Sequence, residues 1–274
     1  MDQLLRAGAD VRLADLDTRA TPGFDGDKAA GEAALAAGAD ELGALQEKLF
    51  AASRAGDERR ILLVLQAMDT AGKGGILRHV VGAVDPQGVA LAAFKKPTPE
   101  ELAEHFLARI ERRLPGPGMI GVFDRSHYED VLIARVRELA PADEIERRYG
   151  EIRDFERRLV DDGTRVIKVM LHISPDEQKE RLQERLDRAD KHWKYNPGDV
   201  DERMLWPTYM EAYERAIAET DADHAPWFVV PADRKWFARL AVQHLLLREL
   251  RALDPQWPAA DFDVDVEHER LAGS

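Results

Sequence analysis

Five short apolar segments recur along the chain, and polar stretches with helical spacing separate them. The segments lie at 61–66 (ILLVLQ), 89–94, 119–124, 166–172 and 227–231. Several of them are nearly continuous apolar runs, which is the pattern of strands buried on both faces. Strands that alternate with helices predict an α/β fold, in which a parallel sheet is covered by helices on both sides.

The stretches between the strands place apolar residues at helical spacing. We expect a first helix from Asp40 to Arg54. Further helices are expected at 76–84, 99–113, 142–161, 175–188 and 233–253. Residues 1–38 are rich in Ala, Gly and Asp and predict an irregular N-terminal arm. Residues 39–255 then form one α/β domain, and residues 256–274 form an acidic tail.

Residues 176–221 interrupt the alternation between the last two strands. Two helical segments flank a polar and aromatic joint, RADKHWKYNPGDVDER, at 188–203. An insertion of this kind is expected to stand off the sheet as a helical hairpin. In an enzyme that must exclude water, such a hairpin closes over the site as a lid.

The composition narrows the class of protein. The 274 residues include no cysteine, which excludes disulfides, cysteine-ligated zinc and thiol catalysis. The sequence contains no secretory signal and no apolar run that could span a bilayer, so we expect a cytoplasmic protein with no membrane partner. The net charge of −13 is opposite in sign to the basic charge that is typical of proteins that bind nucleic acid, so we expect no nucleic-acid partner. A polyanionic substrate would therefore require cations gathered in one place.

A glycine-rich turn, AMDTAGKGG at 67–75, follows the first strand and leads into a helix. This is the context of a P-loop, where backbone N–H groups form a nest for phosphate oxygens. The positions expected to bind phosphate or nucleotide here are Thr70, Ala71, Gly72, Gly74 and Gly75. Lys73 is expected to reach the bound phosphates. The turn departs from the standard P-loop because Ala67 replaces a glycine and Gly74 replaces a Mg²⁺-binding hydroxyl.

Two carboxylates supply a candidate metal site that could replace the missing hydroxyl. Asp69 lies inside the loop, and Asp124 ends the third strand as a Walker-B acid would. Together they are expected to hold Mg²⁺ or Mn²⁺, since oxygen ligands suit both ions. Arg125 is expected to stabilise the transferring phosphoryl group, and Glu129 to contact a nucleotide. The alternatives are a turn cap for Asp69, a helix cap for Asp124 and for Glu129, and a surface ion pair for Arg125.

Basic residues recur on segments that could converge at the carboxyl edge of the sheet, where ligands bind in open α/β folds. They are Arg78, Lys95, Lys96, Arg185, Lys191 and Lys194. This pattern favours a polyanionic substrate despite the negative net charge. Trp193, among the lid cations, is either a base-stacking platform or part of the lid core. Ordinary solvated helix charge is the alternative for most lid arginines.

Four blocks now carry a resemblance to a known family. They are AMDTAGKGG, FDRSHYEDVL (123–132), DKHWKYNPGDVDER (190–203) and APWFVVPADRKWFARL (225–240). In this order, through most of residues 40–250, the chain resembles the family 2 polyphosphate kinases. The resemblance implies a P-loop core similar to thymidylate kinase with a helical lid. It also implies transfer of phosphoryl groups between inorganic polyphosphate and nucleotides with Mg²⁺ or Mn²⁺, and assembly as a homodimer or homotetramer.

The resemblance also assigns roles to individual residues. Asp69 and Asp124 become the metal-binding and catalytic carboxylates, although some relatives carry Asn at the second position. Lys73 and Arg125 become phosphate contacts, and the basic residues around DKHWK line a polyphosphate channel. The FDRSHYEDVL block is most similar to the class that acts on both AMP and ADP, with Glu129 relevant to that preference. Adenine and guanine are not distinguished.

Three other functions remain open at this point. An ATP-dependent nucleotide or small-molecule kinase could use the same fold, although the surplus of basic residues argues against it. A non-catalytic nucleotide sensor or scaffold is a second alternative, and a protein that binds polyphosphate without transfer is a third. Retention of Lys73, Arg125 and both carboxylates argues against the sensor or scaffold.

Overall fold

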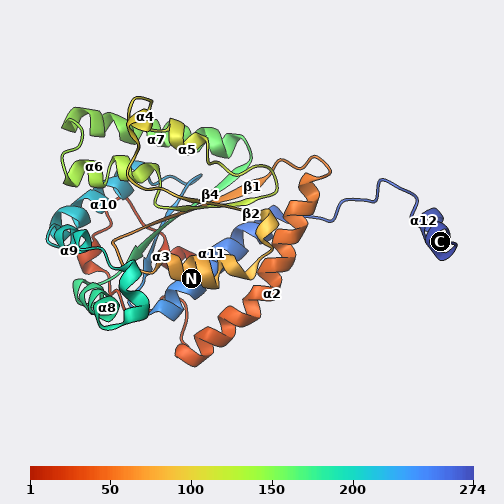
Figure 1. The fold of residues 1–274 in the computed structure, drawn as a ribbon, viewed down its shortest axis with the longest axis horizontal. Coiled ribbons are helices and arrows are strands. Elements are labelled where there is room, and N and C mark those ends of the chain that lie inside the picture. The colour runs from red at the N-terminus through yellow and green to blue at the C-terminus, as the bar shows by residue number, and fades with distance from the viewer.

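A five-stranded parallel sheet forms the centre of the molecule in the computed structural model, which describes residues 1–274 (Figure 1). The strands are β1 (Arg60–Ala67), β2 (Val89–Ala93), β3 (Ile120–Asp124), β4 (Thr164–His172) and β5 (Trp227–Pro231). Their order in the sheet is β2-β3-β1-β4-β5, so β1 is central. Each strand lies within two residues of the apolar run that predicted it, and the α/β expectation is confirmed.

Helices cover both faces of the sheet, with a separate apolar core on each. On one face lie α2 (Lys28–Ser53), α3 (Lys73–His79) and α11 (Lys235–Leu253). On the other lie η4 (His127–Asp130), α6 (Ile133–Val136), α7 (Ala142–Asp161) and α10 (Trp206–Thr220). Strand β1 shows the division: Leu63 and Leu65 belong to the first core, whereas Leu62 and Val64 belong to the second. None of the helices combines the length and apolar character needed to cross a bilayer.

Helix α2 begins well before Asp40, where it was expected, so residues 28–38 are helical rather than irregular. The side chain of Asp27 caps the new start by accepting a backbone hydrogen bond of 2.9 Å from the first turn. Gly31 then packs against Trp236 of α11, where a Cβ atom would lie only 2.3 Å from the ring. The prediction was wrong because packing against α11, and not local apolar spacing, extends this helix.

The N-terminal arm is therefore residues 1–27, and it lies along the edge strand β5. It contains α1 (Asp2–Leu5) and the short 3-10 turn η1 (Leu13–Asp15). The amide of Ala7 donates to the carbonyl of Trp227 over 2.9 Å, and Leu5 is buried in the first core. The arm thus covers an edge of the sheet that would otherwise expose unpaired backbone groups.

The helix expected at 99–113 is divided into α4 (Pro99–Leu102) and α5 (Ala108–Glu111). Between them, the Nδ1 atom of His105 accepts a hydrogen bond from the amide of Leu107 over 3.3 Å. Such a side-chain bond competes with helical pairing and accounts for the break. The helix expected at 76–84 is likewise divided, into α3 and the 3-10 turn η2 (Val81–Ala83); a second 3-10 turn, η3 (Pro86–Gly88), precedes β2.

The segment expected to form a lid contains α8 (Pro175–Asp187), η5 (Ala189–Lys194), α9 (Gly198–Arg203) and α10. The expectation that this segment stands off the sheet as a hairpin is wrong for α10. This helix packs into the second core through Tyr209, Tyr213 and Ile217. These side chains are spaced at three to four residues and form one apolar face. The joint at η5 and the outer face of α8 remain largely exposed.

Residues 256–274 run away from the body of the molecule and end in α12 (Val264–Ala272) (Figure 1). This C-terminal arm exposes the large apolar side chains of Trp257, Phe262 and Leu271. Apolar groups of this size are normally covered, so the arm is unlike an ordinary solvated surface.

Candidate active site

The glycine-rich loop joins β1 to α3 and places its residues at the carboxyl edge of the sheet. Gly72 has a φ of 120°, which a residue with a side chain rarely adopts. Helix α8 holds the loop from above: the Arg181 guanidinium donates to the carbonyls of Thr70 and Ala71, each over 3.0 Å. The side-chain amide of Gln178 donates to the backbone carbonyl of Asp69 over 3.1 Å. The loop is therefore rigidly placed by a helix that is distant in sequence.

The glycine-rich loop forms one wall of the site, and the turn after β3 forms a second. The backbone amide of Arg125 donates to the carbonyl of Leu65 over 3.0 Å, which anchors this turn to β1. Nζ of Lys73 lies 3.9 Å from Oδ1 of Asp124. The cap of the following 3-10 turn, η4, is Ser126, so the helix-cap interpretation of Asp124 is wrong. The Asp124 carboxylate instead faces the loop lysine.

Asp69 and Arg125 form the contact that joins the two walls. Nη2 of Arg125 donates to Oδ1 of Asp69 over 2.9 Å, and Nη1 lies 3.8 Å from the Glu129 carboxylate. Burial opposes the charge of the guanidinium, but Glu129 and Asp69 raise the pKa of Arg125 above its ordinary value. Burial in turn raises the pKa of Glu129, against the opposing charges of Arg125 and Lys73. The four predicted residues Asp69, Lys73, Asp124 and Arg125 thus meet in one place.

A cavity of about 470 Å³ opens beside these residues and is called the larger cavity below. Nine lysines and arginines line it, against three carboxylates. The predicted residues on its wall are Asp69, Thr70, Ala71, Gly72, Lys73, Gly74, Gly75, Arg78, Asp124, Arg125, Arg185, Lys191 and Lys194. A protein with a net charge of −13 has therefore concentrated its cations around the glycine-rich loop.

Sequence reasoning missed part of this wall. Lys235 and Arg239, on the first two turns of α11, also line the larger cavity. Both belong to the block DRKWFARL, and α11 starts after β5 at the same sheet edge as the loop. Their position after a predicted strand was the signal that could have identified them.

Three predicted residues, Lys95, Lys96 and Trp193, do not line the larger cavity. Lys95 and Lys96 are exposed beyond the end of β2, on the edge strand, and β3 separates that strand from β1. The order of strands placed them away from the loop, and a single sequence does not reveal that order. Trp193 is 79 % exposed, so the interpretation as lid core is wrong. Its ring lies 4.8 Å from Nζ of Lys194.

A smaller cavity of about 190 Å³ shares Asp69 and Arg125 with the larger one. Its wall consists of Ala67, Met68, Asp69, Arg125, Glu129, Leu132, Ile133, Asn196, Gly198, Asp199, Glu202, Tyr209 and Tyr213. It holds four carboxylates and a single arginine, together with two tyrosines, so its character is opposite to that of the larger cavity. Burial and the charge of Asp69 raise the pKa of Asp199 to about 6, although Arg185 opposes the shift. Glu129 is the predicted nucleotide contact, and it lies here.

The two carboxylates at the loop are suited to a hard divalent cation. Asp69 and Asp124 follow adjacent parallel strands and present oxygen ligands, which Mg²⁺ and Mn²⁺ prefer. No group of three or more histidine or acidic side chains is placed to form a complete metal site. The ion would therefore need phosphate oxygens and water as further ligands, which is how Mg²⁺ commonly binds in phosphoryl-transfer sites.

Comparisons with known proteins agree with this geometry. Residues 25–258 match the family model for Polyphosphate kinase 2. The chain is 46 % identical to an AMP/ADP-polyphosphate phosphotransferase of Meiothermus ruber, over 90 % of this chain and 91 % of that protein. It is 42 % identical to an ADP-polyphosphate phosphotransferase of Rhodopseudomonas palustris, over 80 % and 78 % of the two chains. The crystal structure of Polyphosphate Kinase 2 from Arthrobacter aurescens superposes with a TM-score of 0.97 at 57 % identity, covering 99 % of this chain and 96 % of the other.

Proposed function

The chain belongs to the polyphosphate kinase 2 family, and from its two cavities we propose how it transfers phosphoryl groups between inorganic polyphosphate and the nucleotides AMP and ADP. It is a phosphotransferase on a P-loop α/β fold. The observation that carries the proposal is the Asp69–Arg125 pair, which lines both cavities at once. Two substrates bound on either side of this pair would meet at it.

Polyphosphate occupies the larger cavity in this proposal. A chain that carries about one negative charge per phosphate requires a wall of cations, and nine are present there. Cations from the loop, from α8 with η5, and from α11 surround the cavity, so consecutive phosphates would find partners along its length. The wall is nearly free of apolar side chains, which suits an inorganic polyanion better than a nucleoside.

The nucleoside part of AMP or ADP occupies the smaller cavity. Tyr209, Tyr213 and Leu132 supply apolar and aromatic surface for a base or a ribose. The carboxylates of Glu129 and Asp199 repel phosphate but accept hydrogen bonds from hydroxyl and amino groups. The acceptor phosphate would then point toward Arg125, where the charge changes sign.

The residues at the meeting point act on charge and alignment. An oxygen of the acceptor phosphate forms a bond to the terminal phosphorus of polyphosphate, and the bond from that phosphorus to the bridging oxygen breaks. The chain is shortened by one phosphate. Lys73 and Arg125 offset the charge on the phosphoryl oxygens. Asp69 and Asp124 would hold Mg²⁺ or Mn²⁺, which when bound neutralises phosphate charge. The nucleophile is already ionised, so no general base is required.

Both AMP and ADP are proposed as acceptors. The support is the name of the Meiothermus ruber relative, which includes both AMP and ADP, whereas the Rhodopseudomonas palustris relative is named for ADP alone. Adenine and guanine nucleotides are not distinguished by the sequence, and the cytoplasmic location stays a prediction. None of these relatives favours the ATP-dependent kinase considered above.

The decisive experiment incubates the purified protein with polyphosphate, Mg²⁺ and either AMP or ADP, and separates the nucleotides by chromatography. We expect ADP and then ATP in the AMP reaction, and ATP in the ADP reaction. Omission of polyphosphate and chelation of the divalent cation are the controls, and each should abolish conversion. ATP from ADP without any product from AMP would restrict the acceptor to ADP.

We further propose that copies of the chain assemble with one another as a dimer or tetramer. The support is the C-terminal arm, on which Trp257, Phe262 and Leu271 are 55 %, 57 % and 74 % exposed. Light scattering after size exclusion should give a mass that is a multiple of the monomer. Replacement of these three residues by serine should lower that mass, and a wild-type monomer would contradict the proposal.

A further inference from the structure

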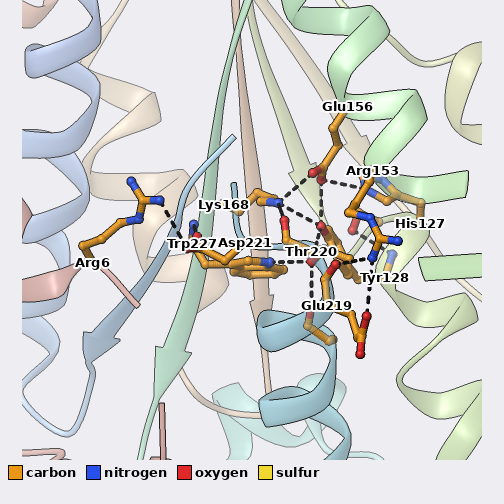
Figure 2. Close-up of polar contacts among 12 residues, drawn as sticks. Arg6, His127, Tyr128, Arg153, Glu156, Lys168, Glu219, Thr220, Asp221 and Trp227 are labelled. Atoms are coloured by element: carbon orange, nitrogen blue, oxygen red, sulfur yellow. Dashed lines mark hydrogen bonds and ion pairs between the residues drawn. The ribbon is translucent and has the colours of Figure 1, made fainter. Parts of the chain in front are cut away.

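A buried lysine that the proposed chemistry does not use lies on β4. Lys168 is completely buried, and its ammonium group uses all three of its donors (Figure 2). It donates to Oε2 of Glu156 over 2.6 Å, to the carbonyl of Thr220 over 2.7 Å and to the hydroxyl of Tyr128 over 3.1 Å. Each N–H bond of the ammonium group is therefore held by an acceptor from a different element of the fold.

The partners of Lys168 are bonded to one another as well. The Tyr128 hydroxyl lies 2.7 Å from Oε1 of Glu156 and 3.0 Å from Oγ1 of Thr220. The indole N–H of Trp227 donates to the same Thr220 oxygen over 2.9 Å. The network thus joins η4, α7, β4, the end of α10 and β5 (Figure 2).

A gain in folding stability is a weak explanation for the presence of such a buried polar network. The transfer of two charges out of water opposes folding, and apolar side chains of similar size often replace a buried ion pair without loss. A fully satisfied polar network differs from an apolar core because its bonds have fixed directions and lengths. What it provides is a definite spacing of the elements that it joins.

The spacing that matters here is between η4 and α10, which both contribute side chains to the wall of the smaller cavity. Tyr128 is followed directly by Glu129, which lines that cavity. Thr220 lies seven residues, about two helical turns, after Tyr213, another lining residue on the same face of α10. None of the network residues lines the larger cavity.

We infer that the network of Lys168, Glu156, Tyr128 and Thr220 sets the width of the smaller cavity, and that its members are positioning residues for the nucleotide and not for polyphosphate. The inference rests on the proposed assignment of the nucleotide to the smaller cavity. It separates two consequences: loosening the network weakens nucleotide binding, and it leaves polyphosphate binding unchanged.

The test removes single hydroxyl groups and keeps the packing. Tyr128→Phe should raise KM for AMP and ADP about tenfold, on the order of one hydrogen bond, with KM for polyphosphate within about twofold of wild type. Thr220→Val should act in the same direction, and Thr220→Ser, which restores the hydroxyl, should return KM for the nucleotides toward wild type. Thr220→Val keeps the inference testable if Tyr128→Phe does not fold.

The matched control is Gln46→Leu. Gln46 is completely buried on α2, at the opposite face of the sheet, and accepts a hydrogen bond from the amide of Asp85 over 3.1 Å. It should lower Tm without changing either KM. The inference is overturned if Tyr128→Phe lowers only Tm, or if it raises both KM values equally.

ADP affinity measured by calorimetry keeps this test separate from the proposed function. If wild type makes no ATP from polyphosphate, the proposed function fails, and the effect of Tyr128→Phe on the Kd for ADP still decides the inference. A Kd weakened about tenfold supports the inference, and an unchanged Kd overturns it.

Discussion

Two residues at the active site adopt backbone conformations that are normally left to glycine. Thr70 has a φ of 67° and Arg125 a φ of 63°. Residues with side chains are strained in this region, so the surrounding structure must hold them there. The carbonyl of Thr70 is held by Arg181, and the amide of Arg125 by Leu65. The strain coincides with the two turns that bring Asp69 and the Arg125 guanidinium together.

Replacement of Asp69 by asparagine is expected to remove activity while preserving the fold. Asp69→Asn keeps the shape but loses the charge that contacts Arg125 and would hold a divalent cation. We expect kcat to fall by a factor of at least about 100, with Tm nearly unchanged. Asp187→Asn, on the exposed side of α8, is the matched control and should retain full activity. Turnover near the wild-type rate in Asp69→Asn would exclude a catalytic carboxylate at this position.

Asp199 gives a prediction for the pH dependence of stability. Burial first, and then the charge of Asp69, raise its pKa in the folded chain from 3.8 to about 6. An acid whose pKa rises on folding favours the folded state only when protonated, so its contribution to stability decreases as the pH rises through this interval. Asp199→Asn should therefore raise Tm relative to wild type above about pH 6, with a difference that shrinks toward about pH 4. Thermal unfolding across this range tests it, and a difference independent of pH would contradict the cause.

Helix α8 serves both the loop and the larger cavity. Its N-terminal half holds the loop backbone through Gln178 and Arg181. Near its C-terminal end, Arg185 donates to the carbonyl of Lys194 over 2.9 Å and pairs with Asp199 over 3.2 Å. The exposed joint that follows α8 is thus attached to a helix which also fixes the glycine-rich loop.

Lys194→Ala tests whether the joint contacts polyphosphate. An exposed cation of this kind contributes modestly, so KM for long-chain polyphosphate should rise about two- to fivefold while KM for ADP changes less. Arg188→Ala is the matched control because Arg188 pairs with Glu184 and Asp190 at the surface. Initial rates with each substrate varied in turn give both constants. An equal rise in the two KM values would argue that the joint does not line the polymer site.

The distribution of charge over the whole molecule is strongly uneven. The net charge is −13, yet the larger cavity carries nine lysines and arginines against three carboxylates. A polyanion approaching most of the surface is repelled, whereas at the cavity it is attracted. The charge distribution therefore favours approach of a polyanion at the larger cavity. This attraction depends on the distance over which dissolved salt screens the charges.

Ionic strength should affect the two substrates differently. Raising the salt concentration from about 0.1 M to 1 M shortens the screening length from about 10 Å to about 3 Å. We expect KM for polyphosphate to rise steeply over this range, and KM for ADP to rise less because its nucleoside part binds in a cavity with apolar walls. Steady-state kinetics in sodium chloride measures both, with Tm as the control for unfolding. A parallel rise of the two constants would contradict separate sites of different character.

Much of the fold and of the candidate site could be predicted because the necessary signals are local. Apolar runs identified all five strands, and the glycine-rich turn after β1 placed Lys73 and Asp69. Asp124 was found from its place at the end of an apolar strand. The extent of α2 could not be predicted, since its first turns depend on contact between Gly31 and Trp236. Residues such as Lys235 were missed because their position after β5 is only a weak local signal, and helix packing brings the start of α11 to the larger cavity.

The sequence by itself determined the class of fold, the glycine-rich loop and the family, because these depend on short segments whose order along the chain is sufficient. Only the tertiary structure decided that β3, and not β2, lies beside β1, and hence that Lys95 and Lys96 lie outside the larger cavity. It also decided that two cavities of opposite character meet at Asp69 and Arg125. The physical reason is that strand order and helix packing arise from contacts between distant segments, which no local pattern records.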